Sequence, residues 1–162
     1  MLEFAIGRGE LGSDLVRRGA WYAGRVSGVE RSSDREIGQV LKEHINRFNM
    51  ATTGISDWHP ITFIVNDEHG RLAGGVDGWE WGGTCYVDAL WVRDDRRNQG
   101  IGSALMAAVE TEARRLGCHQ LAVETHSFQA PTFYEHRGFR RVGEVAGYPR
   151  GHRLISLAKP LA

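Results

Sequence analysis

The junction between two patterned segments, residues 86–92 and 101–116, constrains the fold of this 162-residue chain most strongly. The first segment is a hydrophobic stretch of strand length, and the second repeats apolar residues with the spacing of a helix that covers a sheet. Gly100 and Gly102 lie where the second segment starts, and Gly117 follows its end in the position of a left-handed helix stop. A strand that turns through glycines into a long amphipathic helix predicts a mixed α/β domain.

The rest of the chain adds strands and helices in a regular order. Strands are predicted at 61–65, 72–81, 85–92, 120–125, 139–145 and 154–157, and helices at 33–48, 101–116 and 131–137. Ser33 and Glu36 form a capping box at the start of the first helix, whose apolar stripe should pack on a flat surface. The first three strands are joined by short turns and form an antiparallel meander. The predicted fold is therefore a mixed sheet with helices on its faces.

Strict alternation along residues 85–92 predicts which side chains share a face of the sheet. One face would carry Cys85, Val87, Ala89 and Trp91, and the other would carry Tyr86, Asp88 and Leu90.

Composition narrows the classes of function. The chain has 20 basic and 20 acidic residues, so no overall positive field draws it to nucleic acid or anionic lipid. No apolar run approaches the roughly 18 residues of a membrane helix, and the start at Met1 lacks a signal-peptide pattern, which together predict a cytoplasmic protein. Cys85 and Cys118 lack the spacing of metal ligands and are expected to be buried free thiols. We expect a single domain over residues 25–162, preceded by a glycine-rich N-terminal arm at residues 1–24.

Residues 93–103 have the features of a phosphate-binding turn. Successive backbone N–H groups can converge at Gly100 and Gly102, and the helix N-terminus adds a partial positive charge. Arg96 and Arg97 can supply countercharge. For a Gly-x-Gly pair alone, a turn that simply needs glycine is the alternative.

Two motifs taken together resemble those of the GNAT acetyltransferases. Arg97-x-x-Gly100-x-Gly102, continued by Ser103-Ala104-Leu105, is similar to the pyrophosphate-binding motif of that family. Residues 130–139, which read Ala-Pro-Thr-Phe-Tyr-Glu-His-Arg-Gly-Phe, are similar to its second motif. The resemblance implies a mostly antiparallel sheet of about six or seven strands, splayed in the middle and flanked by helices. It also implies acetyl-CoA as co-substrate. No metal is predicted, because His119, His126, His136 and His152 form no established ligand pair.

The same resemblance assigns coenzyme contacts on both sides of the glycine turn. The pantetheine arm would pair with the backbone of Leu90, Trp91 and Val92. The pyrophosphate would lie on the turn and the first helical residues, which are Arg97, Asn98, Gln99, Gly100, Ile101, Gly102 and Ser103. The family often has asparagine at the position of Ser127, whose hydroxyl can still hydrogen-bond the coenzyme.

Acetyl transfer to an amine requires an acid, a base and an oxyanion donor. The resemblance implies that Tyr134 is the acid that protonates the thiolate, with packing under the sheet as the alternative, and that the N–H of Val92 stabilises the oxyanion. An amine with a pKa of about 10 must lose a proton, for which Asp88 and Glu124 are candidates. Pairing with an arginine is the alternative for either carboxylate. Nothing favours an acetyl-cysteine, so we predict direct attack in a ternary complex.

Aromatic residues near the predicted opening suggest the acceptor. Trp58, Trp79, Trp81 and Tyr86 can form walls for a bulky or cationic amine, with packing under the first helix as the alternative for two of them. A small-molecule amine is the predicted acceptor, and a loop at residues 53–60 argues against a peptide groove. Acetylation of a protein N-terminus or lysine, and a non-catalytic acyl-CoA sensor, are the alternatives. Similar proteins commonly form homodimers, so the resemblance makes a homodimer one expected assembly of this chain.

Overall fold

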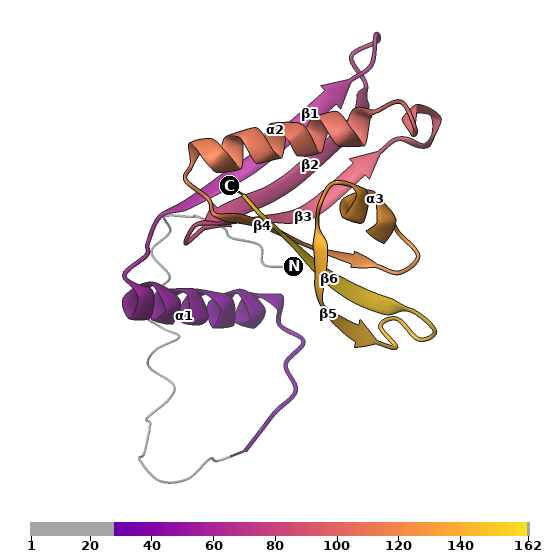
Figure 1. Cartoon of the computed structure of the whole chain (residues 1–162). Helices are drawn as coiled ribbons and strands as arrows, with labels where there is room; N and C mark the ends of the chain where they lie inside the picture. Colours follow the sequence, from indigo (N-terminus) through magenta and orange to yellow (C-terminus); the bar gives the residue numbers. More distant parts are fainter. Residues whose placement is uncertain (1–27, 162) are drawn as a thin grey trace. The chain divides into compact units, whose positions relative to one another are not determined.

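The computed structural model describes residues 28–161, and the chain divides at Gly54 into two compact units (Figure 1). The predicted arm at residues 1–24 lies outside the described residues. In the first unit, helix α1 (Arg35–Thr53) follows Asp34, whose carboxylate accepts a hydrogen bond from the backbone N–H of Glu36 at 2.8 Å. The predicted capping box at Ser33 is therefore wrong, because Asp34 supplies the cap one residue later.

Two predictions about the first unit stay predictions: that the apolar stripe of α1 packs on a flat surface, and that residues 25–162 form one domain. The connection that follows is shorter than predicted. Thr53 ends α1 and Trp58 begins the first strand, so the loop predicted at residues 53–60 is reduced to residues 54–57.

The second unit is built on a six-stranded sheet with the strand order β1-β2-β3-β4-β6-β5. Its strands are β1 (Trp58–Asn66), β2 (Leu72–Trp81), β3 (Thr84–Val92), β4 (Gln120–His126), β5 (Arg140–Ala146) and β6 (Arg153–Pro160). Only β3 and β4 run parallel, and every other neighbouring pair is antiparallel. The predicted mixed, mostly antiparallel sheet is confirmed, and so is the meander of its first three strands.

Helices complete the second unit. The short 3-10 helix η2 (Asp94–Arg96) and helix α2 (Ile101–Arg115) follow β3, and helix α3 (Pro131–His136) follows β4. Figure 1 shows α2 lying along β1, β2 and β3, which it contacts. Among residues 28–161, no helix is both long and apolar enough to cross a membrane.

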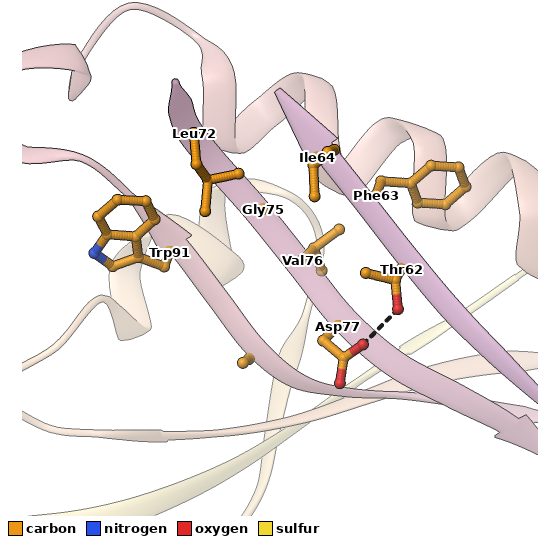
Figure 2. Close-up of a pocket in the computed structure, with 9 residues that line it drawn as sticks. Thr62, Phe63, Ile64, Leu72, Gly75, Val76, Asp77 and Trp91 are labelled. Carbon is orange, nitrogen blue, oxygen red and sulfur yellow. Dashed lines mark hydrogen bonds between the residues drawn. The ribbon is translucent and has the colours of Figure 1, made fainter. Parts of the chain in front are cut away.

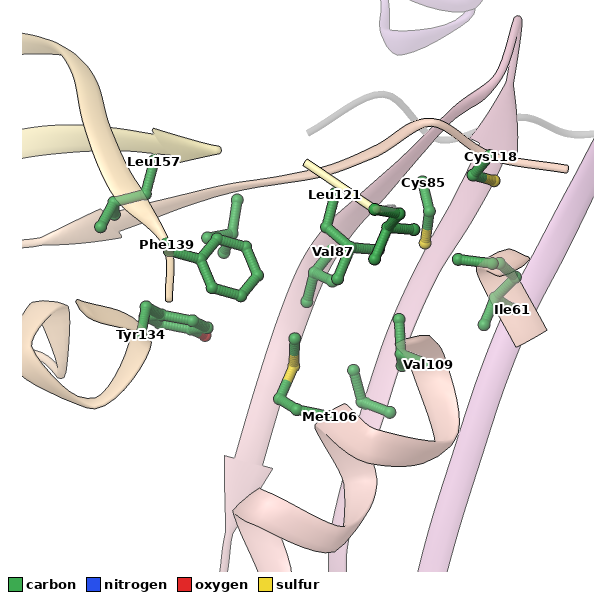
Figure 3. Packing of buried hydrophobic residues seen from close by; sticks show 14 of the residues in the cluster. Ile61, Cys85, Val87, Met106, Val109, Cys118, Leu121, Tyr134, Phe139 and Leu157 are labelled. Carbon is green, nitrogen blue, oxygen red and sulfur yellow. The ribbon is translucent and has the colours of Figure 1, made fainter. Parts of the chain in front are cut away.

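The core lies between α2, α3 and one face of the sheet (Figure 3). The helix α2 contributes Leu105, Met106, Val109 and Ala113, all of which are buried. On the sheet, Cys85 of β3 and Leu121 of β4 pair in register and are both 0% exposed. Burial of this apolar surface stabilises the packing of α2 on the sheet.

The sheet splits between β3 and β4. The two strands pair only from Thr84 with Gln120 to Val87 with Val123. Beyond these pairs β3 continues to Val92 alongside β2, while β4 continues alongside β6. Within the described residues the strands therefore diverge, as Figure 1 shows, and the predicted splay is confirmed.

A β-bulge lies where the split begins. In the β2–β3 pairing, Asp77 is opposite Ala89 but Gly78 is opposite Val87, so Asp88 is an extra residue in β3. Such a bulge bends the strand and changes the direction in which later side chains point.

The bulge makes the predicted alternation wrong beyond Val87. Leu90 packs against the core, whereas Trp91 is 46% exposed on the opposite face. Gly78 permits the close approach, because a Cβ there would collide with the carbonyl oxygen of Tyr86. The face of the sheet that is turned away from α2, called the outer face below, thus carries Tyr86, Ala89 and Trp91 together.

Candidate active site

The loop from β3 to α2 presents an uncapped helix N-terminus. Asn98 and Gly100 have φ values of 60° and 83°, and Gly100 is the residue from which α2 starts. No side chain caps this end of α2, so its first backbone N–H groups lack acceptors within the described chain. A Cβ at Gly100 would meet no described atom within 4 Å. This arrangement of free donors facing open space suits a phosphate group.

The two arginines of this loop differ in their partners. Arg96 donates to both carboxylate oxygens of Glu68, at 2.9 and 3.0 Å, so its charge is compensated inside the protein. Arg97 pairs with Asp94 at 2.5 Å and donates from Nε to the carbonyl of Val92 at 3.2 Å. Both partners of the Arg97–Asp94 pair are exposed, at 57% and 85%. Such a pair contributes little and can open, which leaves Arg97 as the better countercharge.

Three further predicted coenzyme positions lie along β3 past the split. Leu90, Trp91 and Val92 belong to the part of β3 that pairs with β2 but not with β4 in the described structure. An unpaired strand edge exposes backbone donors and acceptors to an extended ligand.

Three of the remaining predicted coenzyme positions already make contacts within the protein, each of a different kind. The side-chain amide of Gln99 donates to the carbonyl of Asp95 at 3.0 Å, so it supports the loop. A Cβ at Gly102 would lie 3.5 Å from the ring of Phe133, in ordinary contact. The hydroxyl of Ser127 accepts a hydrogen bond from the backbone N–H of Arg153 at 3.2 Å, so it already has a partner within the protein.

Tyr134 is buried on α3 and forms part of the core. Its ring packs edge-on against Phe133 and Phe139, with centroid distances of 5.1 and 5.6 Å; Figure 3 shows it beside Phe139. Burial raises the pKa of the Tyr134 phenol to about 12. No described residue forms a hydrogen bond with its hydroxyl. The phenol therefore stays protonated at neutral pH and keeps its proton available for donation.

Glu124 of β4 connects to β3 just beyond the last residue pair between these strands, where they begin to diverge. Its carboxylate accepts hydrogen bonds from the hydroxyl of Tyr86 at 3.4 Å and of Ser156 at 2.9 Å. Pairing with an arginine was the alternative to catalysis for Glu124, but its partners among the described residues are these two hydroxyl groups. Burial, together with Glu124 and Asp88, raises the pKa of Tyr86 to about 12. Asp88 is exposed at the bulge, and among the described residues it has no hydrogen-bond or ion-pair partner.

The four predicted acceptor aromatics share the outer face of the sheet. Trp79 stacks on Tyr86 across β2 and β3, with ring centroids 4.9 Å apart. Trp58 and Trp81 are opposite each other across β1 and β2. The structure thus brings all four aromatic residues onto one face of three neighbouring strands.

The outer face also contains a shallow groove that the sequence analysis missed (Figure 2). Its lining is apolar apart from Thr62 and Asp77, whose side chains are hydrogen-bonded at 2.5 Å. Trp91 lies at one side of the groove (Figure 2). Sequence alternation could not place Trp91 on this face, because the bulge at Asp88 is visible only once β2 and β3 are paired.

Ser156 and the ring contacts of His126 were also missed. Ser156 is opposite Glu124 in the β4–β6 register. The ring of His126 stacks on Phe128 at 5.1 Å and meets Tyr148 edge-on at 5.5 Å. No local pattern links these positions, because β4 and the β5–β6 turn meet only in the folded sheet.

The cysteines do not form a nucleophilic centre. Cys85 and Cys118 are both buried and free. Burial, with Cys118 and Glu80 nearby, raises the pKa of Cys85 to about 12, and burial also raises that of Cys118. Thiols with raised pKa values are weak nucleophiles at neutral pH, which fits the prediction of direct amine attack. Within residues 28–161, no three His, Cys, Asp or Glu residues are grouped as metal ligands would be.

The sequence is similar to those of known acetyltransferases. The sequence model of the Acetyltransferase (GNAT) family matches residues 30–139. Blasticidin-S acetyltransferase of Streptomyces morookaense is 43% identical over 98 residues, which cover 58% of this chain and 70% of that protein. An acetyltransferase of Agrobacterium fabrum strain C58 is 29% identical over 127 residues, 78% of this chain and 93% of that protein.

A solved structure shares the fold. The crystal structure of an acetyltransferase from Bacillus cereus ATCC 14579 has a TM-score of 0.74 and 31% sequence identity, covering 83% of this chain and 98% of that one. Sequence and fold are thus similar to those of acetyltransferases.

Proposed function

Because the chain belongs to the GNAT family of acetyltransferases, we propose that it acetylates the primary amine of a small molecule. It is an N-acetyltransferase, and acetyl-CoA is its acetyl donor. The amine would attack the thioester directly, in a ternary complex. The divergence of β3 from β4 beside the uncapped end of α2 is the observation that carries this proposal.

The residues around the split fit the coenzyme. The backbone of Leu90, Trp91 and Val92 would pair with the extended pantetheine arm, since this edge of β3 has no described strand beside it. The N–H groups of residues 99–103 would hold the pyrophosphate, supported by Arg97. When bound, acetyl-CoA supplies an activated acetyl group, and the protein supplies position and protons.

Tyr134 would act as the general acid. As the new C–N bond forms and the C–S bond breaks, the leaving sulfur requires a proton, which the Tyr134 phenol would donate. Its raised pKa of about 12 keeps it protonated before the reaction. The N–H of Val92 would stabilise the negative charge on the carbonyl oxygen.

A carboxylate near the split would accept the proton of the amine. Glu124 is the better placed candidate, because Tyr86 and Ser156 hold it by hydrogen bonds on either side. Asp88 is the second candidate, at the bulge of β3. The two carboxylates also give this face a negative charge that favours cationic amines.

The aromatic pairs support a small-molecule acceptor. Trp79 stacked on Tyr86, with Trp58 and Trp81 on the adjoining strands, would bind a cationic or bulky amine through cation–π contacts. The relative whose name refers to blasticidin S supports the same class of acceptor. A cytoplasmic location, where acetyl-CoA is available, and assembly into a homodimer belong to the same proposal.

Thiol release from acetyl-CoA tests the function. Purified protein is assayed against blasticidin S, aminoglycosides, polyamines, arylalkylamines and short peptides, and products are identified by mass spectrometry. We expect release that depends on a small-molecule amine and a product heavier by one acetyl group. Release with peptides alone would favour protein acetylation. Tight CoA binding without release for any acceptor would contradict the proposed function and favour a sensor.

A further inference from the structure

A network of charged side chains fastens the β1–β2 turn to the loop before α2. Its centre is Asp67, whose side chain is fully buried. Oδ1 accepts hydrogen bonds from the backbone N–H groups of His69 and Arg71, at 2.9 and 3.0 Å. Oδ2 accepts from Nε of Arg71 at 3.1 Å and from Nη2 of Arg93 at 2.9 Å. The first three bonds close the turn itself, but the fourth comes from the far end of β3.

Arg93 connects this turn to the loop that leads to α2. Its guanidinium donates to the carboxylate of Asp95 at 2.6 and 3.2 Å, and to the carbonyl of Leu72 at 3.2 Å. Its backbone N–H donates to the carbonyl of Ala73 at 2.9 Å. The side chain and the backbone of Arg93 thus hold the same two segments together.

A second bridge runs beside the first, from Arg96 to both oxygens of Glu68. The whole network contains three carboxylates and three guanidiniums, which are Asp67, Glu68, Asp95, Arg71, Arg93 and Arg96. These charges cancel, so the network adds no net field that would attract an anion. An effect of the network on coenzyme binding would therefore come through geometry and not through charge.

The loop that follows has a conformation that needs support. Asn98, a residue with a Cβ, has a φ of 60°, and Gly100 has a φ of 83° just before α2 begins. Asparagine adopts this conformation more readily than other residues with a Cβ, but the right-handed region is still more favourable, so contacts around the loop help to hold it. The network is anchored within the same loop at Asp95 and Arg96, and Gln99 donates to the carbonyl of Asp95.

We propose that Asp67, acting through Arg93, is a positioning residue for the coenzyme's pyrophosphate, because this bridge fixes the loop that presents the N–H groups of residues 99–103. The proposal rests on the proposed function. It makes the β1–β2 turn part of what determines coenzyme affinity, although no residue of the turn would touch the coenzyme.

Arg93→Gln tests the proposal by removing the bridge while keeping a polar side chain. We expect the Kd of CoA, measured by calorimetry without acceptor, to rise about tenfold, since small misplacements of binding groups carry large costs. The KM of acetyl-CoA should rise equally, with kcat at saturation within about twofold of the wild-type value. The KM of acetylpantetheine, which lacks the pyrophosphate, should not change. Arg93→Lys, which can still reach Asp67, should recover part of the affinity.

Glu112→Gln is the matched control. It breaks the Glu112–Arg115 pair on α2, which has similar distances of 2.6 and 2.8 Å but lies away from the loop. CoA affinity equal in Arg93→Gln and in this control would overturn the proposal, as would an equal loss with acetylpantetheine. If Arg93→Gln does not fold, Asp67→Asn tests the same bridge from its other end by the same measurements. Wild-type protein that binds no CoA would instead contradict the proposed function.

Discussion

At the scale of single residues, the Tyr134 hydroxyl offers the sharpest test of the chemistry. Its ring is packed in the core, but the hydroxyl has no hydrogen-bond partner among the described residues. Tyr134→Phe removes the oxygen without leaving a buried group unpaired. We expect kcat to fall about 100-fold, the contribution of a positioned general acid, with CoA affinity and Tm unchanged. A kcat within twofold of the wild-type value would show that Tyr134 only packs.

Glu124 makes a second prediction at this scale. If it accepts the proton of the amine, Glu124→Gln should lower kcat/KM for the acceptor strongly at pH 7. The loss should shrink as the pH rises toward about 10, because more of the amine is then already neutral in solution. A pH–rate profile from pH 6 to 10 measures this.

Asp88→Asn is the paired variant for that profile. It removes the other nearby carboxylate but breaks no hydrogen bond with a described residue, so we expect a smaller loss at every pH. The reverse order, with Asp88→Asn the more damaging and the more pH-dependent change, would assign the base to the bulge residue.

At the scale of elements, the bulge in β3 depends on one glycine. Gly78→Ala would force its Cβ against the Tyr86 carbonyl, so the β2–β3 ladder must shift. We expect the free energy of unfolding to fall by about 3 kcal/mol, as overpacking of a closely packed site does. Urea denaturation measures the change. Gly143→Ala in β5 is the control, since its Cβ would meet only Ser156, at 4.0 Å. Equal losses in the two variants would contradict this role for Gly78.

The elements themselves were largely predictable from the sequence. All six strands and both α-helices of the second unit occur close to their predicted positions, because their apolar periodicity reports burial directly, whereas the short 3-10 helix η2 was not predicted. The errors lie where a structure depends on pairing across the chain. The alternation along β3 failed at Asp88, because a bulge is a property of two strands in register.

In the candidate site, too, the features carried by a short stretch of sequence were predictable, and those that depend on distant residues meeting were not. The glycine turn and Tyr134 belong to contiguous motifs, so a resemblance could indicate them. The pairing of Glu124 with Tyr86 and Ser156 joins three strands, and Asp67 joins Arg93 across 26 positions. Arg96 was expected to face an anion, yet it faces Glu68. None of these contacts has a signal within a short window of sequence.

At the scale of the whole molecule, the buried Asp67 should make stability depend on pH. Burial alone would raise its pKa, but hydrogen bonds from the backbone of Arg71, the Arg93 guanidinium and other donors outweigh burial and hold the pKa well below its usual range. A carboxyl with a depressed pKa in the folded state stabilises the protein above its unfolded pKa, about 4, and loses that contribution as the pH falls toward the folded value.

Asp67→Asn measures this contribution. The Tm of the wild type should exceed that of the variant most at neutral pH, and the gap should narrow as the pH falls below about 4. Thermal unfolding at several pH values from 7 to 3 follows the gap. A constant difference over that range would mean that the ionised form of Asp67 is not what stabilises the fold.

The split gives the sheet a closed end, where β3 and β4 pair, and an open end, where they diverge. The closed end consists of the four residue pairs between β3 and β4, and the pair Cys85 and Leu121 within it is completely buried. The width of the open end is then set by the angle between two stiff half-sheets. A small change in packing among these four pairs would alter that angle and so the width of the open end. We therefore expect substitutions of the buried pair Cys85 and Leu121 to change the size of the acyl group that the protein accepts.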